Sequence, residues 1–439
     1  MNSPTPHRSG RRRTQALLLT ATIPLTVAVA ISSVPASAAP GISAEIFCPP
    51  ASMTIGVPTS TDIYDTDGGS FTPSISAGTL PTGLALVNPA PLAAQVVGTP
   101  TTLGSFVYSI KLTDNLGRYA EKTCMTDVLP VGSTVSRLGG LDRYHESVLI
   151  GDQVTKGADA PLVYVASGEK YADALSAASV AAQRGAPLLL TTTDRVPEVV
   201  TQAIVAYKAR QIVVVGGESS ISMTGMALLS VGTSATVTRI GGVDRYDTSR
   251  KLISDTTFGA KPSTELFVAS GTKFPDALSA SPAAATIPAP VLLVNGAEPT
   301  LTAAEHSLVT GRGVKKVTVF GGEDTLSRGL NDSLAAAAGA SSRIDGADRY
   351  AVAARSVAKH FPSTIPSDTV YLATGTDFPD ALAGGALAGA NHAPILLVSK
   401  SCMTRETAAE ITRLKPQHLV LLGGPNTLDA ALGRLPICN

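Results

Sequence analysis

The sequence contains no Trp, and aromatic residues make up only 4% of its 439 positions. This shortage disfavours a sugar-binding cleft built from stacked aromatic rings. Long hydrophobic runs are also missing after the first 40 residues, where Gly, Pro and polar residues interrupt every apolar stretch. We therefore expect no membrane span in the mature protein. Hydrophobic residues nevertheless reach 44%, which is enough for folded cores and excludes a disordered chain.

Motifs of hydrolytic enzymes are absent too. The sequence has neither Gly-x-Ser-x-Gly nor His-Glu-x-x-His, which would indicate a serine hydrolase or a zinc protease. A short acidic segment, Asp62, Asp65 and Asp67 before Gly68, resembles the start of a calcium loop, but the required Glu does not follow. The sequence therefore predicts a protein that is not an enzyme and that uses no metal and no cofactor.

Charge is divided unevenly along the chain. The first 40 residues carry four Arg and no acid, residues 41–134 carry three basic and seven acidic residues, and residues 135–439 carry 27 of each sign. The absence of a basic surplus argues against nucleic-acid binding driven by net charge. Any polyanion must be bound by locally placed Arg side chains.

Residues 1–38 have the pattern of an export signal. Basic residues at Arg8 and from Arg11 to Arg13 precede an apolar segment from Ala16 to Ile31, and Ala36-Ser37-Ala38 is a small-residue cleavage site. An uncleaved membrane anchor is the alternative, but the short apolar segment favours cleavage. We expect a secreted protein of the cell wall or cell surface.

The four Cys residues all follow this signal and fall into two groups, Cys48 with Cys124 and Cys402 with Cys438. An oxidising compartment favours disulfides over free thiols. Four Cys allow three pairings, and pairing within each group is the economical choice. We predict these two bridges.

One motif recurs three times along the chain. It reads Arg137-Leu-Gly-Gly-Leu-Asp-Arg-Tyr144, then Arg239-Ile-Gly-Gly-Val-Asp-Arg-Tyr246, then Arg343-Ile-Asp-Gly-Ala-Asp-Arg-Tyr350, at intervals of 102 and 104 residues. Three further blocks recur in step with it: an apolar run before Asp-Ala-Leu, a Pro followed by aliphatic residues, and an apolar run that ends in Gly-Gly. Four ordered blocks in three copies indicate a repeat architecture.

The blocks also predict the structure of one repeat. Asp142, Asp244 and Asp348 are suited to cap the N-terminus of a helix, because their carboxylates can accept its free backbone N–H groups. The apolar runs alternate with helical segments, which predicts a parallel sheet covered on both faces. Residues 41–132 differ: Phe106 to Leu112 alternates at strand period and Asp114 to Gly117 predicts a turn. We expect an all-β sandwich there.

The repeated motif closely resembles the cell wall binding repeat 2 family, over residues 137–438. The resemblance implies Rossmann-like or Toprim-like α/β units in a pseudo-threefold arrangement, which bind anionic wall polymers such as teichoic acids or secondary polysaccharides. Asp345, where the other copies have Gly, is a departure that would weaken or reshape the third site. Leu80-Pro-Thr-Gly-Leu84, together with Gly98-Thr-Pro100, resembles a bacterial Ig-like domain.

The resulting expectation is a multidomain chain. It divides into a signal peptide (1–38), an Ig-like β-sandwich (41–132) and three cell wall binding repeats (135–232, 237–336 and 341–438).

Two sets of side chains are candidates for binding the polymer. The first set contains arginines, whose guanidinium forks suit phosphate and carboxylate oxygens; the alternative is that each Arg holds its own turn. The second contains acids that follow the first strand of each repeat and could accept hydrogen bonds from sugar hydroxyls; the alternative is a helix cap. The candidates are Arg137, Arg143, Asp173, Arg239, Arg245, Asp276, Arg343, Arg349 and Asp380.

The predicted function is non-covalent anchoring to the bacterial cell wall through an anionic polymer, with no nucleic-acid partner. Two alternatives stay open. The protein could be an adhesin that uses its Ig-like domain, or an accessory to a wall hydrolase or to other surface proteins. A passive coat component whose repeats only assemble laterally is a further reading.

Overall fold

The computed structural model describes residues 44–65, 71–88, 94–130, 132–287, 289–362 and 367–438. The predicted signal peptide, residues 1–38, lies outside the described residues. Within the described part of the chain, no helix has both the length and the apolar character needed to cross a membrane.

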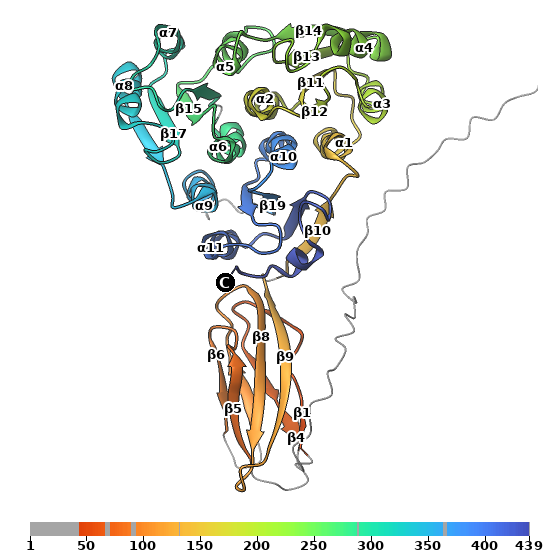
Figure 1. The fold of residues 1–439 in the computed structure, drawn as a ribbon, viewed down its shortest axis with the longest axis vertical. Coiled ribbons are helices and arrows are strands. Elements are labelled where there is room, and N and C mark those ends of the chain that lie inside the picture. Colours follow the sequence, from red (N-terminus) through yellow and green to blue (C-terminus); the bar gives the residue numbers. More distant parts are fainter. Residues whose placement is uncertain are drawn as a thin grey trace, which may run out of the picture. The chain divides into compact units, whose positions relative to one another are not determined.

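Residues 44–130 form a β-rich domain (Figure 1). Two sheets, with strand orders β2-β9-β8-β5 and β3-β7-β6, share an apolar core, and β1 pairs with β4. The strands are β1 (Glu45–Ile46), β2 (Ser52–Thr54), β3 (Thr59–Asp62), β4 (Tyr64–Asp65), β5 (Thr72–Gly78), β6 (Leu84–Val87), β7 (Gln95–Gly98), β8 (Gly104–Thr113) and β9 (Tyr119–Leu129).

Strand alternation explains this core. Tyr108, Ile110 and Leu112 on β8 point to one face and are almost fully buried, as the period of two predicts. The predicted turn follows β8 directly, where Asp114 accepts hydrogen bonds from the backbone N–H groups of Leu116 and Arg118. Both features confirm what the sequence indicates for this segment.

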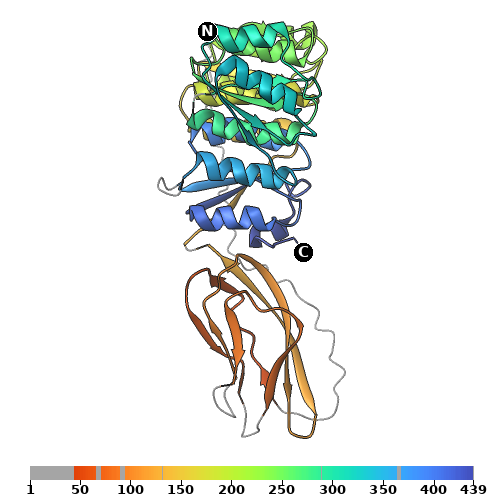
Figure 2. The ribbon, with the colours of Figure 1, turned by 90° about the vertical axis from the view of Figure 1, so that its left-hand side faces the viewer.

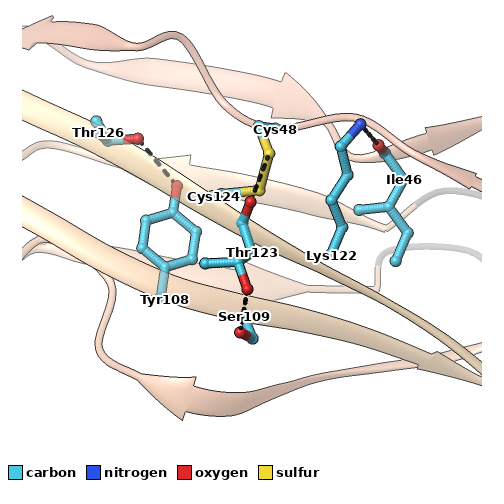
Figure 3. The surroundings of a disulfide bond; sticks show 8 residues. All are labelled: Ile46, Cys48, Tyr108, Ser109, Lys122, Thr123, Cys124 and Thr126. Carbon is cyan, nitrogen blue, oxygen red and sulfur yellow. Dashed lines mark hydrogen bonds between the residues drawn. A yellow bond between two sulfur atoms is a disulfide. The ribbon is translucent and has the colours of Figure 1, made fainter. Parts of the chain in front are cut away.

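The predicted Cys48–Cys124 disulfide is present and joins the segment after β1 to strand β9 (Figure 3). Around it, the Lys122 ammonium donates to the Ile46 carbonyl at 2.7 Å, and the Tyr108 hydroxyl lies 3.0 Å from that of Thr126. The bridge therefore lies in a region where the first strand of the domain is already bonded to its last.

The repeat region, residues 134–438, contains three sheets of four parallel strands each. Their orders are β12-β11-β13-β14, β16-β15-β17-β18 and β20-β19-β21-β10. The strands are β10 (Thr134–Leu138), β11 (Leu162–Ser167), β12 (Leu188–Thr191), β13 (Gln211–Val215), β14 (Thr236–Ile240), β15 (Glu265–Ser270), β16 (Val291–Val294), β17 (Lys316–Phe320), β18 (Ser341–Ile344), β19 (Thr369–Thr374), β20 (Ile395–Val398) and β21 (His418–Leu422).

Helices cover both faces of each sheet, which confirms the predicted α/β organisation (Figures 1 and 2). On β11, for example, Val163 and Val165 face one core while Tyr164 and Ala166 face the other. The helices are α1 (Arg143–Thr155), α2 (Tyr171–Arg184), α3 (Glu198–Ala206), α4 (Met223–Thr233), α5 (Arg245–Ser254), α6 (Phe274–Thr286), α7 (Ala303–Gly311), α8 (Arg328–Ala338), α9 (Arg349–His360), α10 (Pro379–Ala390), α11 (Arg405–Leu414) and the 3₁₀ helix η1 (Ala430–Arg434).

The fourth strand of each sheet comes from the start of a recurring motif. Strand β14 opens the second motif yet completes the first sheet, and β18 likewise completes the second sheet. The third sheet is completed by β10, which opens the first motif and pairs with β21. The period of the sequence and the limits of the sheets therefore differ by one strand, and the repeats close into a ring.

Helices α2, α6 and α10 pack on one another at the centre of this ring, where Figure 1 shows them nearly end-on. At equivalent positions they carry Ala178, Ser281 and Gly385, and a Cβ placed on Gly385 would lie 3.1 Å from the Cβ of Ser281 and 3.8 Å from that of Ala178. The small side chains expected for these helices are what allows three of them to meet around one pseudo-threefold axis.

The second predicted disulfide, Cys402–Cys438, is also present. It fastens the last residues of the described chain to the segment after β20, next to a bridge between Met403 and Ile437.

Candidate functional site

The recurring blocks meet at the carboxyl ends of the parallel strands. There each Asp-Arg-Tyr begins helix α1, α5 or α9, and the predicted caps are confirmed. The Asp142 carboxylate accepts from the backbone N–H groups of Tyr144 and His145 at 2.9 and 2.8 Å. Asp244 and Asp348 occupy the same position in their helices. The acid of the motif therefore fixes the start of a helix.

The Arg of each Asp-Arg-Tyr reaches across its own repeat. Arg143 donates to the Gly168 carbonyl at 2.6 Å, and Arg245 donates to the Gly271 carbonyl at 2.5 Å. Arg349 bonds the Gly375 carbonyl in the same way. All three residues are only half-buried, so each Arg holds the loop after the first strand of its sheet while part of the residue stays exposed.

The earlier Arg of each motif acts between repeats. Arg239 on β14 donates to the carbonyls of Gly216 and Ile221 at 2.8 and 2.7 Å, both in the segment after the neighbouring strand β13, which belongs to the preceding sequence repeat. Arg343 bonds the Gly321 carbonyl at 2.6 Å. These guanidinium groups are occupied by backbone carbonyls of the Gly-Gly turns, and burial lowers their pKa values.

Arg137 makes the equivalent contacts across the point where the ring closes. It donates to the carbonyls of Gly423 and Asp429 at 2.7 and 3.1 Å, close to 300 residues further along the chain. The three arginines Arg137, Arg239 and Arg343 thus join each motif to the neighbouring repeat.

The acids after the first strands lie beneath the Gly-Gly turns. Asp173 is 7% exposed and accepts from the Ser220 hydroxyl at 2.5 Å. A Cβ on Gly216, whose φ is +123°, would lie 2.5 Å from the Asp173 carboxylate. Only Gly tolerates both this backbone conformation and this close approach, which explains why Asp-Ala-Leu and Gly-Gly recur together.

Asp276 and Asp380 occupy the same place in the other two repeats. A Cβ on Gly321 or on Gly423 would lie 2.5 Å from the respective carboxylate. Burial raises the pKa of all three acids, and that of Asp380 to about 6. All three carboxylates therefore support the turns from below.

The third copy of the motif differs locally. Asp345, which replaces the Gly of the other copies, pairs with Arg355 on helix α9 at 2.8 Å. Both side chains are more than half exposed. The substitution thus adds a surface ion pair beside the motif of the third repeat.

Two aromatic residues that the sequence reasoning missed lie at the N-termini of the central helices. The rings of Tyr171 and Phe378 are 5.9 Å apart, with Arg245 over the first and Arg143 over the second at 5.5 and 5.7 Å. The sequence did contain a pattern that could have identified them, because an aromatic residue stands two positions before each of the three Asp-Ala-Leu blocks. Each such contact ties a motif Arg to the neighbouring repeat.

The loop tips before the helix caps complete this face. Leu141 and Val243, at equivalent positions, are 91% and 94% exposed, and Ala347 in the third repeat is exposed as well. Each tip stands two residues before a half-exposed Arg. The same combination of an apolar contact point and a guanidinium is thus presented three times, beside helix N-termini whose dipoles favour anions.

One buried residue breaks the symmetry. Glu146 follows Arg143 by three positions and is 2% exposed, whereas the equivalent residues are Thr248 and Val352. Burial, with a further contribution from Asp380, raises the pKa of Glu146 to about 8. Sequence alone offers no sign of this, because Glu is common in helices that face solvent.

Comparison with known proteins identifies the repeats. Residues 137–224, 239–340 and 343–432 each match the family model described as Cell wall binding domain 2 (CWB2). The N-acetylmuramoyl-L-alanine amidase LytC of Bacillus subtilis (strain 168) is 31% identical over 268 residues, which cover 61% of this chain and 51% of the relative. The amidase enhancer of the same strain is 25% identical over 300 residues, which cover 68% and 39%.

The chain thus spans about half, or less, of the length of these curated relatives. Among solved structures, Cwp6 from Clostridium difficile superposes with a TM-score of 0.64 at 18% identity, over 90% of this chain and 68% of that one. Cwp8 from the same organism gives 0.60 at 21% identity, over 83% and 62%. These structures share the fold.

Proposed function

Because this chain belongs to the cell wall binding domain 2 family, we propose that it is a secreted, non-enzymatic protein that anchors itself to the cell wall by binding anionic wall polymers. Export by residues 1–38 is part of this proposal. The observation that carries it is the threefold presentation of Arg143, Arg245 and Arg349, half-exposed beside apolar loop tips and helix N-termini. A repeating polyanion could engage several of these points at once.

The candidate residues take different parts in this proposal. Arg143, Arg245 and Arg349 contact the polymer, since each of these residues is only half-buried. The earlier arginines of the motif have a structural part and do not contact the polymer, because their N–H groups already donate to backbone carbonyls of the Gly-Gly turns. These residues are Arg137, Arg239 and Arg343. Asp173, Asp276 and Asp380 hold the Gly-Gly turns in the same way. Equal numbers of basic and acidic residues in the repeats make local placement of Arg, rather than net charge, the source of affinity.

The test is sedimentation of the full chain with isolated cell walls, before and after the walls are stripped of anionic polymer. We expect binding to native walls, a clear loss on stripped walls, and weakening as salt rises. Equal binding to stripped walls would exclude the anionic polymer as the ligand and indicate binding to peptidoglycan.

Arginine variants locate the site. Changing Arg143, Arg245 and Arg349 together to Lys keeps the charge but removes the fork, and changing them to Ala removes both. We expect the Ala variant to bind roughly tenfold more weakly, corresponding to about 1.4 kcal/mol, with the Lys variant in between. The matched control changes the exposed Arg210, Arg328 and Arg405 to Ala, which alters net charge equally. Equal losses in variant and control would mean that the motif arginines are not the site.

A second candidate function is support of a wall hydrolase. It is favoured by the two relatives, one named as an amidase and the other as an amidase enhancer. In this case the protein would raise the rate at which an added N-acetylmuramoyl-L-alanine amidase clears a wall suspension. An unchanged clearance rate would remove this candidate and leave anchoring untouched.

A further inference from the structure

The interface at which the first repeat closes on the third differs from the other two. It joins β10 to β21 and packs α1 against α10, and it includes the bonds from Arg137 to the carbonyls of Gly423 and Asp429. The chain does not run directly from the third repeat back into the first, so non-covalent contacts alone hold this interface closed. We call it the closing interface.

The residue three positions after the Arg of Asp-Arg-Tyr differs at each of the three interfaces between repeats. Between the first and second repeats, the neutral side chain of Thr248 lies beside the buried carboxyl group of Asp173. Its hydroxyl donates to the Asp244 carbonyl at 2.9 Å and accepts from the N–H of Gly242 at 3.0 Å. Between the second and third repeats the equivalent residue is Val352, which cannot bond an acid. At the closing interface it is Glu146, which interacts electrostatically with Asp380. Two buried carboxyl groups therefore influence one another where the other interfaces have one.

The Glu146 carboxyl group is enclosed but incompletely bonded. Its Oε2 accepts from the backbone N–H of Gly140, while Oε1 is buried with no hydrogen-bond partner among the described residues. The N–H of Gly423 donates to the Leu138 carbonyl of β10 at 2.8 Å, and a Cβ on the same Gly423 would lie 2.5 Å from the Asp380 carboxylate. A Cβ on Gly424 would lie 3.1 Å from the carbonyl of Gly140, the residue that bonds Glu146, so both carboxyl groups are buried beside the Gly423-Gly424 turn of the closing interface.

Charged groups reach this cluster from every element that surrounds it. Helix α1 contributes Arg143 and His145 beside Glu146, strand β10 contributes Arg137, and the third repeat contributes acids from α10, from the loop before it and from the segment before η1. The two arginines favour ionised carboxylates, whereas the neighbouring acids disfavour them. The groups from the third repeat are Asp377, Asp380 and Asp429.

We propose that Glu146 and Asp380 form a proton-linked latch: the closing interface is tight while the pair holds a proton and loosens when both carboxyl groups are ionised. A protonated Glu146 places no charge beside the buried Asp380 carboxyl group, just as the neutral Thr248 places none beside Asp173 at the first interface. Once Glu146 is ionised, two buried negative charges repel across the interface. The latch is independent of which polymer the repeats bind.

The electrostatics agree with this geometry and set the pH range. The pKa values of Glu146 and Asp380 are raised to about 8 and about 6, each chiefly by burial. A raised pKa of an acid means that the folded chain binds more protons than the unfolded chain. The stability gained is therefore fully present in acid and is lost as pH rises through about 8.

The experiment compares the full chain with Glu146→Thr, which installs the residue of the first interface. Hydrogen-exchange protection of the β10 amides is measured from pH 5 to pH 9, corrected for intrinsic exchange. We expect the wild-type chain to lose at least tenfold of its protection at β10 between these limits, while protection in β14 stays constant. Glu146→Thr should flatten the β10 profile. Equal pH profiles for the two chains at β10 would overturn the proposal.

A reciprocal variant tests whether the same pH response can be transferred to the first interface. Thr248→Glu places the acid opposite Asp173 at the first interface, and we expect it to transfer the alkaline loss of protection to β14. If Thr248→Glu fails to fold, the comparison at β10 between wild type and Glu146→Thr still decides. A folded Thr248→Glu chain whose β14 protection does not respond to pH would count against the latch.

Discussion

The β-rich domain and the repeat region differ in how their contacts are distributed. The first has one core, which includes Phe71 and Tyr108, and one disulfide between its ends. The second builds its axis from Ala, Ser and Gly, and spreads its polar contacts over three copies of each motif. In the β-rich domain each contact is unique. In the repeat region the same contact can be compared in three settings, so differences between copies show what each interface requires.

The largest effect should come from opening the disulfide of the β-rich domain. Changing Cys48 and Cys124 to Ser releases a loop with a sequence separation of 76, which costs about 4 kcal/mol in the chain-entropy model. We expect the β-rich domain to unfold at a clearly lower temperature while the repeats keep theirs. Calorimetry with hydrogen exchange of β8 and α2 separates the two. The matched control is the Cys402, Cys438 pair changed to Ser, which should affect the third repeat alone; equal shifts in both regions would break the comparison.

A smaller effect is expected at the axis of the ring. Gly385→Val adds a branched side chain where a Cβ already lies 3.1 Å from the Cβ of Ser281, and overpacking of this kind costs about 1–3 kcal/mol. Thermal unfolding of the repeats should shift downward, with the β-rich domain unchanged. Gly311→Val serves as control, because a Cβ there meets nothing within 4 Å. Similar shifts for the two variants would show that the low helix propensity of Val, and not packing at the axis, determines the loss of stability.

Much of the fold follows from local patterns in the sequence. The three α/β repeats, the helix caps at Asp142, Asp244 and Asp348 and both disulfides are confirmed, since each depends on nearby residues or on repetition along the chain. The assignment of the sandwich as Ig-like and of the repeats as Rossmann-like or Toprim-like stays a prediction, as do the exact domain limits and the binding residues.

Other features depend on contacts that sequence spacing does not encode. That β10 completes the third sheet rests on a pairing across nearly the whole repeat region. The sequence shows that Arg137 equals Arg239 and Arg343 in its motif, but not that its carbonyl partners are near the other end of the chain. Glu146 is likewise one acid in an ordinary helical segment until the third repeat buries it. Equivalence in sequence therefore predicts the type of contact, and tertiary closure decides its partner.

The smallest effects should distinguish the three helix caps. Replacing Asp142, Asp244 or Asp348 by Ala removes a cap worth about 1 kcal/mol. Asp142 and Asp348 each accept two backbone N–H groups, whereas Asp244 accepts one. At the second motif the Asp247 carboxylate already accepts from the Val243 N–H at 3.1 Å. We therefore expect Asp244→Ala to be the mildest of the three.

Thermal unfolding and exchange in the first turns of α1, α5 and α9 would measure this order. Asp142→Ala should also lower protection at β10, because α1 carries Glu146 into the closing interface, whereas Asp348→Ala should leave β10 unchanged. If all three variants cost the same and none affects β10, the three motifs are energetically equivalent and the closing interface is not coupled to the start of α1. A selective effect of Asp142→Ala would mean that a local cap in the first repeat helps to hold the whole ring closed.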